Sequence, residues 1–421
     1  MNESKKLVVV AGVRTPFCKM GSDLAAVSAV DLAAGAMRSM MADAGIRMDV
    51  VDEVILGCVC QPFDAANIAR VVALRAGVPM DRPAVTVQRN CASGMESVIS
   101  AAVRMQACCG DVFLVGGVES MSTVPLLFRA QAAKKFAALA RERGALGKLK
   151  RMAAFRPSDF APVIGLQLGL TDPVSGLGMG QTAELLAREY GISREAQDEF
   201  ANQSHHKAAA GAEQFAAEIA PIYTAKGKAV TTDNGVRSDS SVEGLGRLRP
   251  VFDRSFGSVT AGNSSQISDG AAVMLVASEE RARSEGWPVL GRVDAFAVTG
   301  CDPARMGLGP VHAIRKIAKE TGVKPDACDV VEINEAFAVQ VLAVLKELEN
   351  DGLAVRADQL NPNGGAIALG HPVGASGARL LLTSLQTLRR GGGKRALASL
   401  CVGGGQGVAV LMSAEKGGAN E

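Results

Sequence analysis

The 421-residue chain contains few of the residues that mark metal sites or nucleic-acid-binding surfaces. It has four histidines, one tryptophan and 4% aromatic residues, and no CxxC pair accompanies the histidines. These shortages argue against a structural zinc site and against platforms that stack nucleic-acid bases. The 45 Lys and Arg nearly balance the 43 Asp and Glu, so the basic excess of a nucleic-acid-binding protein is also missing. We therefore expect no bound metal and no nucleic-acid partner.

Long hydrophobic runs are missing near the N-terminus as well. The apolar run at residues 7–13 stops at Arg14, so it is too short to span a membrane and favours a buried strand. The nine cysteines are an odd number scattered over a long chain, which makes a poor disulfide framework. A reducing, cytoplasmic location is the expectation that follows.

Glycine and apolar residues are plentiful, with 47 glycines and a hydrophobic content of 48%. A chain of this length allows two or three domains. Short β-branched runs lie at residues 7–13, 51–56, 112–116, 329–333 and 396–402. Ala-rich segments with helical character lie at residues 31–44, 96–106 and 378–388. This alternation predicts parallel strands joined by crossover helices.

The two ends of the chain are similar to each other. Ala-Ser-Gly occurs at 92–94 and again at 375–377, and each copy precedes a helix-like segment. Each segment is followed by a strand-like run and a Gly-Gly pair, at 116–117 and at 403–404. We interpret this pattern as two copies of one α/β unit, paired so that their helix N-termini lie near each other.

A basic segment separates the two copies. From Arg129 to Arg156 there are nine Lys or Arg and one acid, Glu142, so the segment carries +8 and the rest of the chain about −6. Apolar residues recur at helical spacing around Gly144 and Gly147, which predicts two short amphipathic helices. Such helices can bind an anionic membrane, the phosphates of a ligand or a partner protein, and a solvated surface is the simplest alternative.

Four side chains stand where an acyl-transfer reaction would use them. Cys91 precedes a predicted helix, whose dipole and free N–H groups lower the pKa of a thiol, although a buried structural cysteine is the plainer interpretation. His371 lies in a glycine-rich turn before a helix, and Cys401 and Asn334 lie at the ends of predicted strands. Ligands bind beyond the carboxyl ends of such strands. A nucleophilic thiol, a base and a second thiol together suit acyl transfer through a thioester.

These motifs resemble those of the thiolase family over nearly the whole chain. They are Arg-Thr-Pro-Phe at 14–17, Asn-Cys-Ala-Ser-Gly at 90–94, Gly-Gly-Val-Glu-Ser-Met-Ser at 116–122, Met-Gly-Gln-Thr-Ala-Glu at 179–184, Thr-Ala-Gly-Asn-Ser-Ser-Gln at 260–266, Asn-Glu-Ala-Phe at 334–337, Gly-His-Pro-Val-Gly-Ala-Ser-Gly at 370–377 and Cys-Val-Gly-Gly-Gly at 401–405. The resemblance implies an α/β fold, a duplicated βαβαβαββ unit in five layers (α-β-α-β-α) with an inserted loop domain. Its parts would be an N-terminal half at 1–123 completed by about 253–285, a loop domain at 124–252 covering the CoA site, and a C-terminal half at 286–421.

The resemblance also implies a role for each matching residue. Cys91 would be the nucleophile that becomes acylated, His371 the base that activates thiols, and Cys401 the acid and base at the α-carbon of acetyl-CoA. Asn334 would hold a water in one oxyanion hole, and the backbone N–H of Gly403 would contribute to the other. The substrate-binding positions of the family match Met179, Arg237, Ser265 and Phe337. Coenzyme A would be a co-substrate, and no cofactor would be tightly bound.

The function that the resemblance implies is that of a degradative 3-ketoacyl-CoA thiolase, which cleaves 3-ketoacyl-CoA with CoA to acetyl-CoA and a shortened acyl-CoA. A condensing acetyl-CoA acetyltransferase, which makes acetoacetyl-CoA, is the alternative, and a non-catalytic binding subunit is a third possibility. Gly178 stands where short-chain biosynthetic members carry His, which leaves space beside the acyl path. The partners implied are a second copy of the chain, in a homodimer or homotetramer, and a fatty-acid oxidation subunit or an anionic membrane surface at Arg129 to Arg156.

Overall fold

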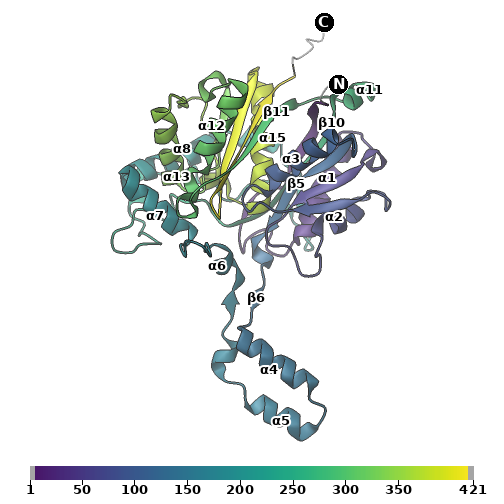
Figure 1. The fold of residues 1–421 in the computed structure, drawn as a ribbon, viewed down its shortest axis with the longest axis vertical. Coiled ribbons are helices and arrows are strands. Elements are labelled where there is room, and N and C mark those ends of the chain that lie inside the picture. The colour runs from purple at the N-terminus through teal and green to yellow at the C-terminus, as the bar shows by residue number, and fades with distance from the viewer. Residues whose placement is uncertain (1–4, 416–421) are drawn as a thin grey trace. The chain divides into compact units, whose positions relative to one another are not determined.

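The computed structural model describes residues 5–415, which form two compact units. The larger unit comprises the residues up to Thr123 together with those from Asp172 onward. The smaller unit is Val124–Thr171, which contains helices α4 and α5 in Figure 1. All nine residues with an implied role in catalysis or substrate binding belong to the larger unit, and the basic segment belongs to the smaller one.

One ten-stranded sheet runs through the larger unit, in the order β12-β13-β14-β11-β1-β10-β5-β3-β4, with β2 beside β10. Its strands are β1 Leu7–Arg14, β2 Cys18–Lys19, β3 Glu53–Gly57, β4 Ala84–Val87, β5 Val112–Ser120, β10 Ser268–Ser278, β11 Gly291–Gly300, β12 Val330–Ile333, β13 Arg395–Val402 and β14 Gln406–Ser413. β3 pairs in parallel with β4 and β5, and β12 with β13, as the alternation predicted. The other pairs are antiparallel, which the alternation of strands and helices does not predict. The turn between β13 and β14 is too short for the crossover that a parallel pair needs.

The helices cover this sheet in layers (Figure 1). α3 (Ser93–Gln106) and α15 (Val373–Gly391) pack on each other and on strands of both halves of the sheet, so they form the central layer. The outer layers are α1 (Ala29–Asp43) and α2 (Ile68–Ala76) on the N-terminal half, and α12 (Gly309–Thr321) and α13 (Ala338–Asn350) on the C-terminal half. The five layers expected from the resemblance are confirmed.

The central helix α15 is buried on nearly every side. Its buried leucines are Leu380, Leu381, Leu382, Leu385 and Leu388. The buried Arg379 on another side of the helix forms an ion pair with the buried Glu332 at 3.0 Å, as a charge enclosed in a central layer requires. The helix begins at Val373, five residues before the predicted start, because the glycines, alanine and serine of 374–377 also adopt helical conformation when they are packed.

Small residues let the two central helices meet where they begin. A Cβ on Gly94 would lie 2.6 Å from the backbone nitrogen of Ala378, and a Cβ on Gly377 would lie 2.7 Å from that of Met95. Only glycine permits such an approach of two backbones. The prediction that the two repeated motifs bring their helix N-termini together is confirmed.

The remaining helices of the larger unit are α7 Met179–Tyr190, α8 Arg194–Ala210, α9 Ala212–Ala216, α10 Val242–Gly246, α11 Glu279–Ser284 and α14 Ala366–Leu369. The 3-10 turns of the two units are Met48–Val50, Met121–Thr123, Pro157–Phe160, Pro303–Leu308 and Pro325–Ala327, and β8 (Ile222–Tyr223) pairs with β9 (Ala229–Val230). Within residues 5–415 no helix combines the length and apolar character needed to cross a membrane. The same residues contain no cluster of three His, Cys, Asp or Glu side chains placed to hold a metal ion.

The smaller unit is built from two main helices, α4 (Ala130–Arg141) and α5 (Ala145–Ala153). It also contains α6 (Gly165–Gly169) and a short antiparallel pair, β6 (Leu126–Leu127) with β7 (Val163–Ile164). The prediction of two short basic helices that break near Gly144 is confirmed. The loop domain at 124–252 is a longer stretch than this unit and stays a prediction.

Candidate active site

Cys91 lies in a tight turn between β4 and α3. Asn90 has a φ of +42°, in the left-handed region that Asn adopts more readily than most residues. Burial raises the pKa of the half-buried Cys91 thiol, and the N–H groups of Gly403 and of Cys91 itself lower it. The net direction is upward, so the low pKa expected from a helix N-terminus is not found. Cys91 precedes the first helical residue, Ser93, by two positions, and the loss of hydration outweighs the dipole.

Cys401 lies near the end of β13, directly before the turn that contains Gly403. Its side chain is buried, and burial raises the pKa of this thiol well above its usual value, with the nearby Cys91 adding to the effect. Cys401 is therefore a neutral thiol at physiological pH, which is the form that can donate a proton.

Two side chains connect the Cys91 turn to the turn between β13 and β14. Asn90 Nδ2 donates to the carbonyl oxygen of Gly403 at 2.7 Å, and Arg89 Nη1 donates to Gln406 Oε1 at 2.9 Å. The peptide on the other side of Gly403 directs its N–H at the Cys91 thiol. Arg89 and Asn90, from the first copy of the fold, thus hold in place the turn of the second copy that lies beside Cys91.

His371 is presented by a glycine turn and oriented by a serine. Gly370 has a φ of +103°, and a Cβ there would lie 2.2 Å from Ser268 Oγ, so glycine is required. Ser376 Oγ donates to the carbonyl of Pro372 at 2.9 Å and lies 2.6 Å from His371 Nδ1. Because the serine proton is already used, Nδ1 carries the imidazole proton and donates it to Ser376 Oγ.

The other nitrogen of His371 is the basic one. Nε2 is buried and has no hydrogen-bond partner within the part of the chain that the structure describes. Burial, together with the smaller effect of the charge of Arg379, lowers the pKa of His371 to about 4. The ring is therefore neutral at physiological pH and holds a free lone pair on Nε2, as a general base must.

Asn334 follows β12 and is fully buried. Its backbone N–H donates to the carbonyl of Ser399 at 3.0 Å, which holds the residue against β13. Neither the oxygen nor the nitrogen of its side-chain amide has a partner among residues 5–415. Buried polar groups are nearly always hydrogen-bonded, so this amide is equipped to bind a water or a ligand.

Three of the four substrate-binding candidates lie near the thiols. Met179 and Phe337 belong to one apolar cluster with Cys401, and a Cβ on Gly403 would lie 3.2 Å from Met179 Sδ. Ser265 donates its backbone N–H to Ala336, next to Phe337, at 3.0 Å. Arg237 is exposed, and its backbone N–H donates to Nδ1 of His205, so its position is tied to α8 rather than to the thiols.

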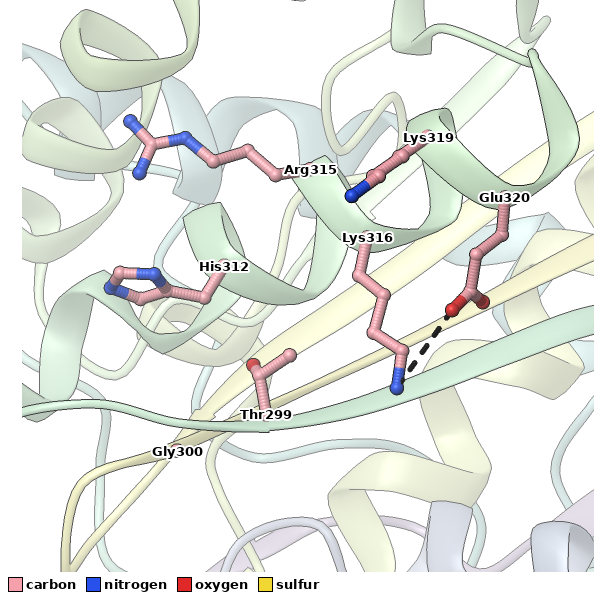
Figure 2. A pocket seen from close by; sticks show the side chains of 7 residues that line it. All are labelled: Thr299, Gly300, His312, Arg315, Lys316, Lys319 and Glu320. Atoms are coloured by element: carbon pink, nitrogen blue, oxygen red, sulfur yellow. Dashed lines mark ion pairs between the residues drawn. The ribbon is translucent and has the colours of Figure 1, made fainter.

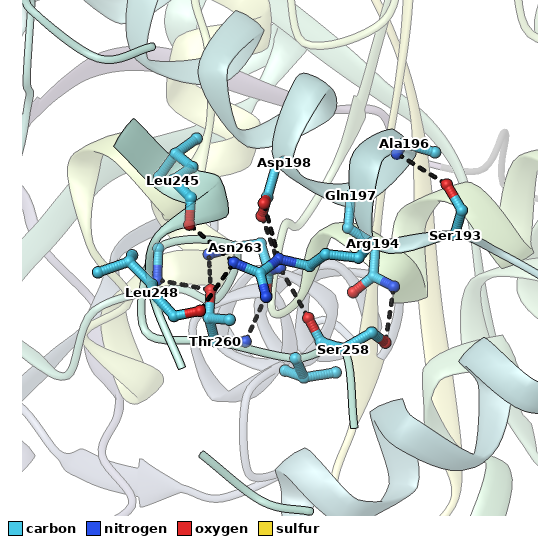
Figure 3. Close-up of polar contacts among 12 residues, drawn as sticks. Ser193, Arg194, Ala196, Gln197, Asp198, Leu245, Leu248, Ser258, Thr260 and Asn263 are labelled. Carbon is cyan, nitrogen blue, oxygen red and sulfur yellow. Dashed lines mark hydrogen bonds and ion pairs between the residues drawn. The ribbon is translucent and has the colours of Figure 1, made fainter. Parts of the chain in front are cut away.

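A buried polar network fixes the loop that leads to Ser265 (Figure 3). Asn263 Nδ2 donates to Asp198 Oδ1 at 2.9 Å, and Asn263 Oδ1 accepts from the Thr260 N–H at 2.7 Å. Arg194 Nε in turn donates to Asp198 at 2.7 Å. The Thr-Ala-Gly-Asn-Ser-Ser-Gln motif at 260–266 thereby takes one rigid path from α8 to the site.

Glu119 connects the loop after β3 to the N-terminus of α15, and the sequence interpretation gave it no role. Its carboxylate accepts the N–H groups of Val59, Cys60 and Gly374, at 3.2, 2.9 and 3.0 Å. Burial raises the pKa of Glu119 to about 7, although these donors lower it. The available signal was an acid at the end of an apolar strand, in the Gly-Gly-Val-Glu motif. No separate signal in the sequence marks Asn90, because its partner Gly403 lies 313 residues away.

A surface groove of about 500 Å³ beside α12 does not contain any of these residues (Figure 2). It is lined by Thr299, Gly300, His312, Arg315, Lys316, Lys319 and Glu320. Arg315 forms ion pairs with Glu347 and Asp351, and Lys316 lies 4.0 Å from Glu320. Much of its positive charge is already compensated, so we assign it no part in the chemistry.

Comparison with known proteins supports a family assignment. The model of the thiolase N-terminal domain matches residues 7–280, and that of the thiolase C-terminal domain matches residues 287–414. The chain is 39% identical to an acetyl-CoA acetyltransferase of Chromobacterium violaceum, over 97% of this chain and 99% of that protein. It is 41% identical to the mitochondrial 3-ketoacyl-CoA thiolase of Rattus norvegicus, over 96% and 97% of the two chains.

A solved structure gives the same result for the fold. The crystal structure of human mitochondrial 3-ketoacyl-CoA thiolase in complex with CoA matches with a TM-score of 0.86 and 37% identity, over 97% of this chain and 98% of that chain. The two family domains thus match in order over almost the full length of the chain. The chain also has the Cys91 turn, the buried His371 and the second thiol, Cys401. The chain belongs to the thiolase family of acyltransferases.

Proposed function

We propose that this protein is a degradative 3-ketoacyl-CoA thiolase, which uses CoA to cleave 3-ketoacyl-CoA through an acyl-cysteine intermediate. One observation carries the proposal. His371 is neutral with its lone pair on Nε2, and it lies two residues before α15, whose first turn contacts that of α3, the helix that follows the nucleophile candidate Cys91. The protonated second thiol, Cys401, lies close enough to Cys91 for that thiol to affect its ionisation. A base, a nucleophile and an acid are the three groups that cleavage of a 3-keto thioester needs.

In the first half-reaction, His371 Nε2 takes the proton of Cys91, and the sulphur adds to the 3-keto carbon. The oxyanion that forms accepts the N–H groups of Cys91 and Gly403, which point at the sulphur. The bond between C2 and C3 then breaks, and its electron pair stays on C2 as the enolate of acetyl-CoA. Cys401 gives its proton to C2, acetyl-CoA leaves, and the shortened acyl group remains on Cys91. The proton on His371 passes to the Cys401 thiolate.

In the second half-reaction, CoA replaces the enzyme thiol. His371 takes the proton of the CoA thiol, and the CoA sulphur attacks the carbonyl carbon of the acyl-Cys91 thioester. The bond to Cys91 breaks, the shortened acyl-CoA leaves, and His371 returns the proton to Cys91. Asn334 is proposed to hold the water of the second oxyanion hole, supported by its buried amide without a protein partner among the described residues.

The choice of a degradative enzyme acting on longer acyl chains, over a condensing one, rests on a different observation, the residue before α7. Gly178 is the N-cap of this helix and has no side chain, and the next residue, Met179, lies beside Gly403. An acyl chain longer than acetyl therefore meets no imidazole at this position. Condensation of two acetyl-CoA to acetoacetyl-CoA is the second candidate function, since the relative in Chromobacterium violaceum is named as an acetyltransferase.

The experiment that separates the two is CoA-dependent loss of the enolate absorbance of acetoacetyl-CoA and of a long-chain 3-ketoacyl-CoA. We expect kcat/KM for the long substrate to equal or exceed that for acetoacetyl-CoA. Activity confined to acetoacetyl-CoA would transfer the assignment to the acetyltransferase. Activity on neither, in a folded protein, would favour a non-catalytic binding subunit.

We also propose a homodimer or homotetramer in the cytoplasm. The edge strand β4 supports self-assembly, since its four residues are only half-buried and it ends the sheet directly before the Cys91 turn. Light scattering that finds a monomer at micromolar concentration would contradict this. Nine free thiols support a reducing compartment.

A further inference from the structure

The smaller unit, Val124–Thr171, leaves an unusual amount of apolar surface in contact with solvent. Of the 22 large hydrophobic residues that are exposed in the described chain, nine belong to these 48 residues. They are Leu126, Leu127, Phe128, Leu146, Leu149, Met152, Phe160, Ile164 and Leu168. Exposed apolar patches of this kind mark interaction surfaces in natural proteins.

Seven of these side chains, all except Phe128 and Phe160, take no part in the aromatic packing inside the unit. Its interior is an aromatic cluster in which Phe136 contacts Phe128, Phe155 and Phe160 at centroid distances of 5.0, 4.8 and 6.2 Å. Lys135 lies over the Phe155 ring and forms an ion pair with the buried Asp159 at 2.6 Å. These contacts join α4 to the segment after α5 and leave the face of α5 uncovered.

The exposed face of α5 has the pattern of a helix that lies in an interface. Leu146, Leu149 and Met152 are 86%, 66% and 59% exposed and follow at intervals of three residues. At about 100° per residue they share one side of the helix, with Lys148 and Lys150 at its two edges. An amphipathic helix whose polar face is basic is typical of binding to anionic lipid.

The net charge of the smaller unit also favours an anionic surface. It has nine Lys and Arg against two acids, a net charge of +7, which leaves −5 for the rest of the chain. Of the nine basic side chains in the smaller unit, only Lys135 and Arg151 form ion pairs within residues 5–415. The charge of the other seven is not offset by a carboxylate in contact with them in that part of the chain. An anionic surface therefore attracts this unit and repels the remainder, which orients the protein.

We propose that the smaller unit binds an anionic phospholipid surface, with α5 in the plane of the headgroups and its apolar face among the acyl chains. A lipid surface fits better than an acidic protein groove, since the cations stand on long flexible stems around the helix. This inference does not depend on the direction of the thiolase reaction.

The test uses the full chain and vesicles of phosphatidylcholine with about one-third phosphatidylglycerol, compared with phosphatidylcholine alone. We expect co-sedimentation with the anionic vesicles only, and its loss at about 1 M salt, where the Debye length is about 3 Å. The triple variant K148Q/K150Q/R151Q should bind about 100-fold more weakly, since each basic residue near the surface contributes about fivefold. The variant L146Q/L149Q/M152Q should lose about tenfold or more through its apolar face.

The matched control is R47Q/K226Q/R283Q, which removes three exposed charges from the larger unit and should bind as the wild type does. Cleavage of acetoacetyl-CoA at wild-type rate in every variant shows that the larger unit is folded, and an unchanged far-UV circular dichroism spectrum shows that the helices of the smaller unit are retained. Equal binding by the control and K148Q/K150Q/R151Q would overturn the proposal, as would equal binding to both vesicles. No vesicle binding by the wild type would refute the lipid surface and leave a protein partner as the occupant.

Discussion

The two central helices carry the same tripeptide near their N-termini but present different chemistry. In the first copy, Ser93 Oγ donates to the carbonyl of Asn90 at 2.7 Å and accepts the N–H of Arg89 at 2.9 Å. In the second, Ser376 Oγ donates to the carbonyl of Pro372 and receives the proton of His371 Nδ1. One serine closes the turn that carries a thiol, and the other sets the tautomer of a base. The duplication repeats the scaffold, and a few residues before each helix decide its function.

The largest effect should come from the residue that the first copy presents. Cys91→Ala removes the proposed nucleophile, and we expect thiolysis to fall by about 10⁴-fold or more, since a covalent route cannot proceed without it. Steady-state kinetics with acetoacetyl-CoA measure the loss. Cys109→Ala, at an exposed thiol outside the site, is the matched control and should keep full activity. Equal activity of C91A and the wild type would remove Cys91 from the mechanism.

The second copy presents a base, so His371→Gln should cost about 10²–10⁴-fold in kcat. Because the pKa of His371 is lowered to about 4, activity should not fall through titration of this ring between pH 8 and pH 6. A wild-type profile that declines with an apparent pKa near the ordinary histidine value would contradict the neutral, buried base.

The same pKa has a consequence for stability that H371Q should remove. The unfolded chain binds a proton at this position below about pH 6.5, and the native state does so only near pH 4. The contribution of His371 to the free energy of unfolding therefore decreases as pH falls from about 6.5 to 4. His205, whose pKa is also lowered to about 4, acts in the same direction, whereas Glu119 and Glu332, whose pKa burial raises to about 7, act in the opposite one. Relative to the wild type, H371Q should therefore lose less stability, or gain more, as pH falls over this range. Denaturant titrations at several pH values measure both slopes.

Replacing the two equivalent serines sharpens the comparison directly. Ser376→Ala frees the Nδ1 proton of His371 from its acceptor, and we expect about 10–100-fold lower kcat, by analogy with loss of a residue that orients a catalytic ligand. Ser93→Ala breaks bonds to backbone groups only, so it should mainly lower stability, by about 1–2 kcal/mol. Chemical denaturation and kinetics on both variants test this. A loss of kcat in S93A as large as that in S376A would mean that the two serines have the same role.

The smallest effect concerns the contact between the copies. Asn90→Ala removes the 2.7 Å bond to Gly403 and places Ala in a left-handed conformation, whereas Asn90→Gly removes the bond and tolerates the conformation. We expect both to lose about tenfold in kcat, because Gly403 is less well held, and only N90A to lose about 1 kcal/mol more in stability. If N90G keeps full activity, the bond does not position Gly403.

The repeat and the motifs predicted the architecture well, because duplication and hydrophobic periodicity are local properties of a sequence. The adjacency of the helix N-termini followed from the repeated Ala-Ser-Gly, since glycines 94 and 377 admit the contact. The antiparallel strands of the sheet did not follow, because alternation of elements does not state the direction in which a strand joins its neighbour.

The sequence by itself determined which residues could carry chemistry: thiols at 91 and 401, an imidazole at 371 and an amide at 334. The tertiary structure decided their ionisation. Burial raises the pKa of Cys91 where the helix position alone suggested the opposite, and it makes His371 neutral. Bonds from Asn90 to Gly403 and from Glu119 to Gly374 join segments more than 250 residues apart. Hydration and long-range contacts depend on what the folded chain places around a group, so no local pattern contains them.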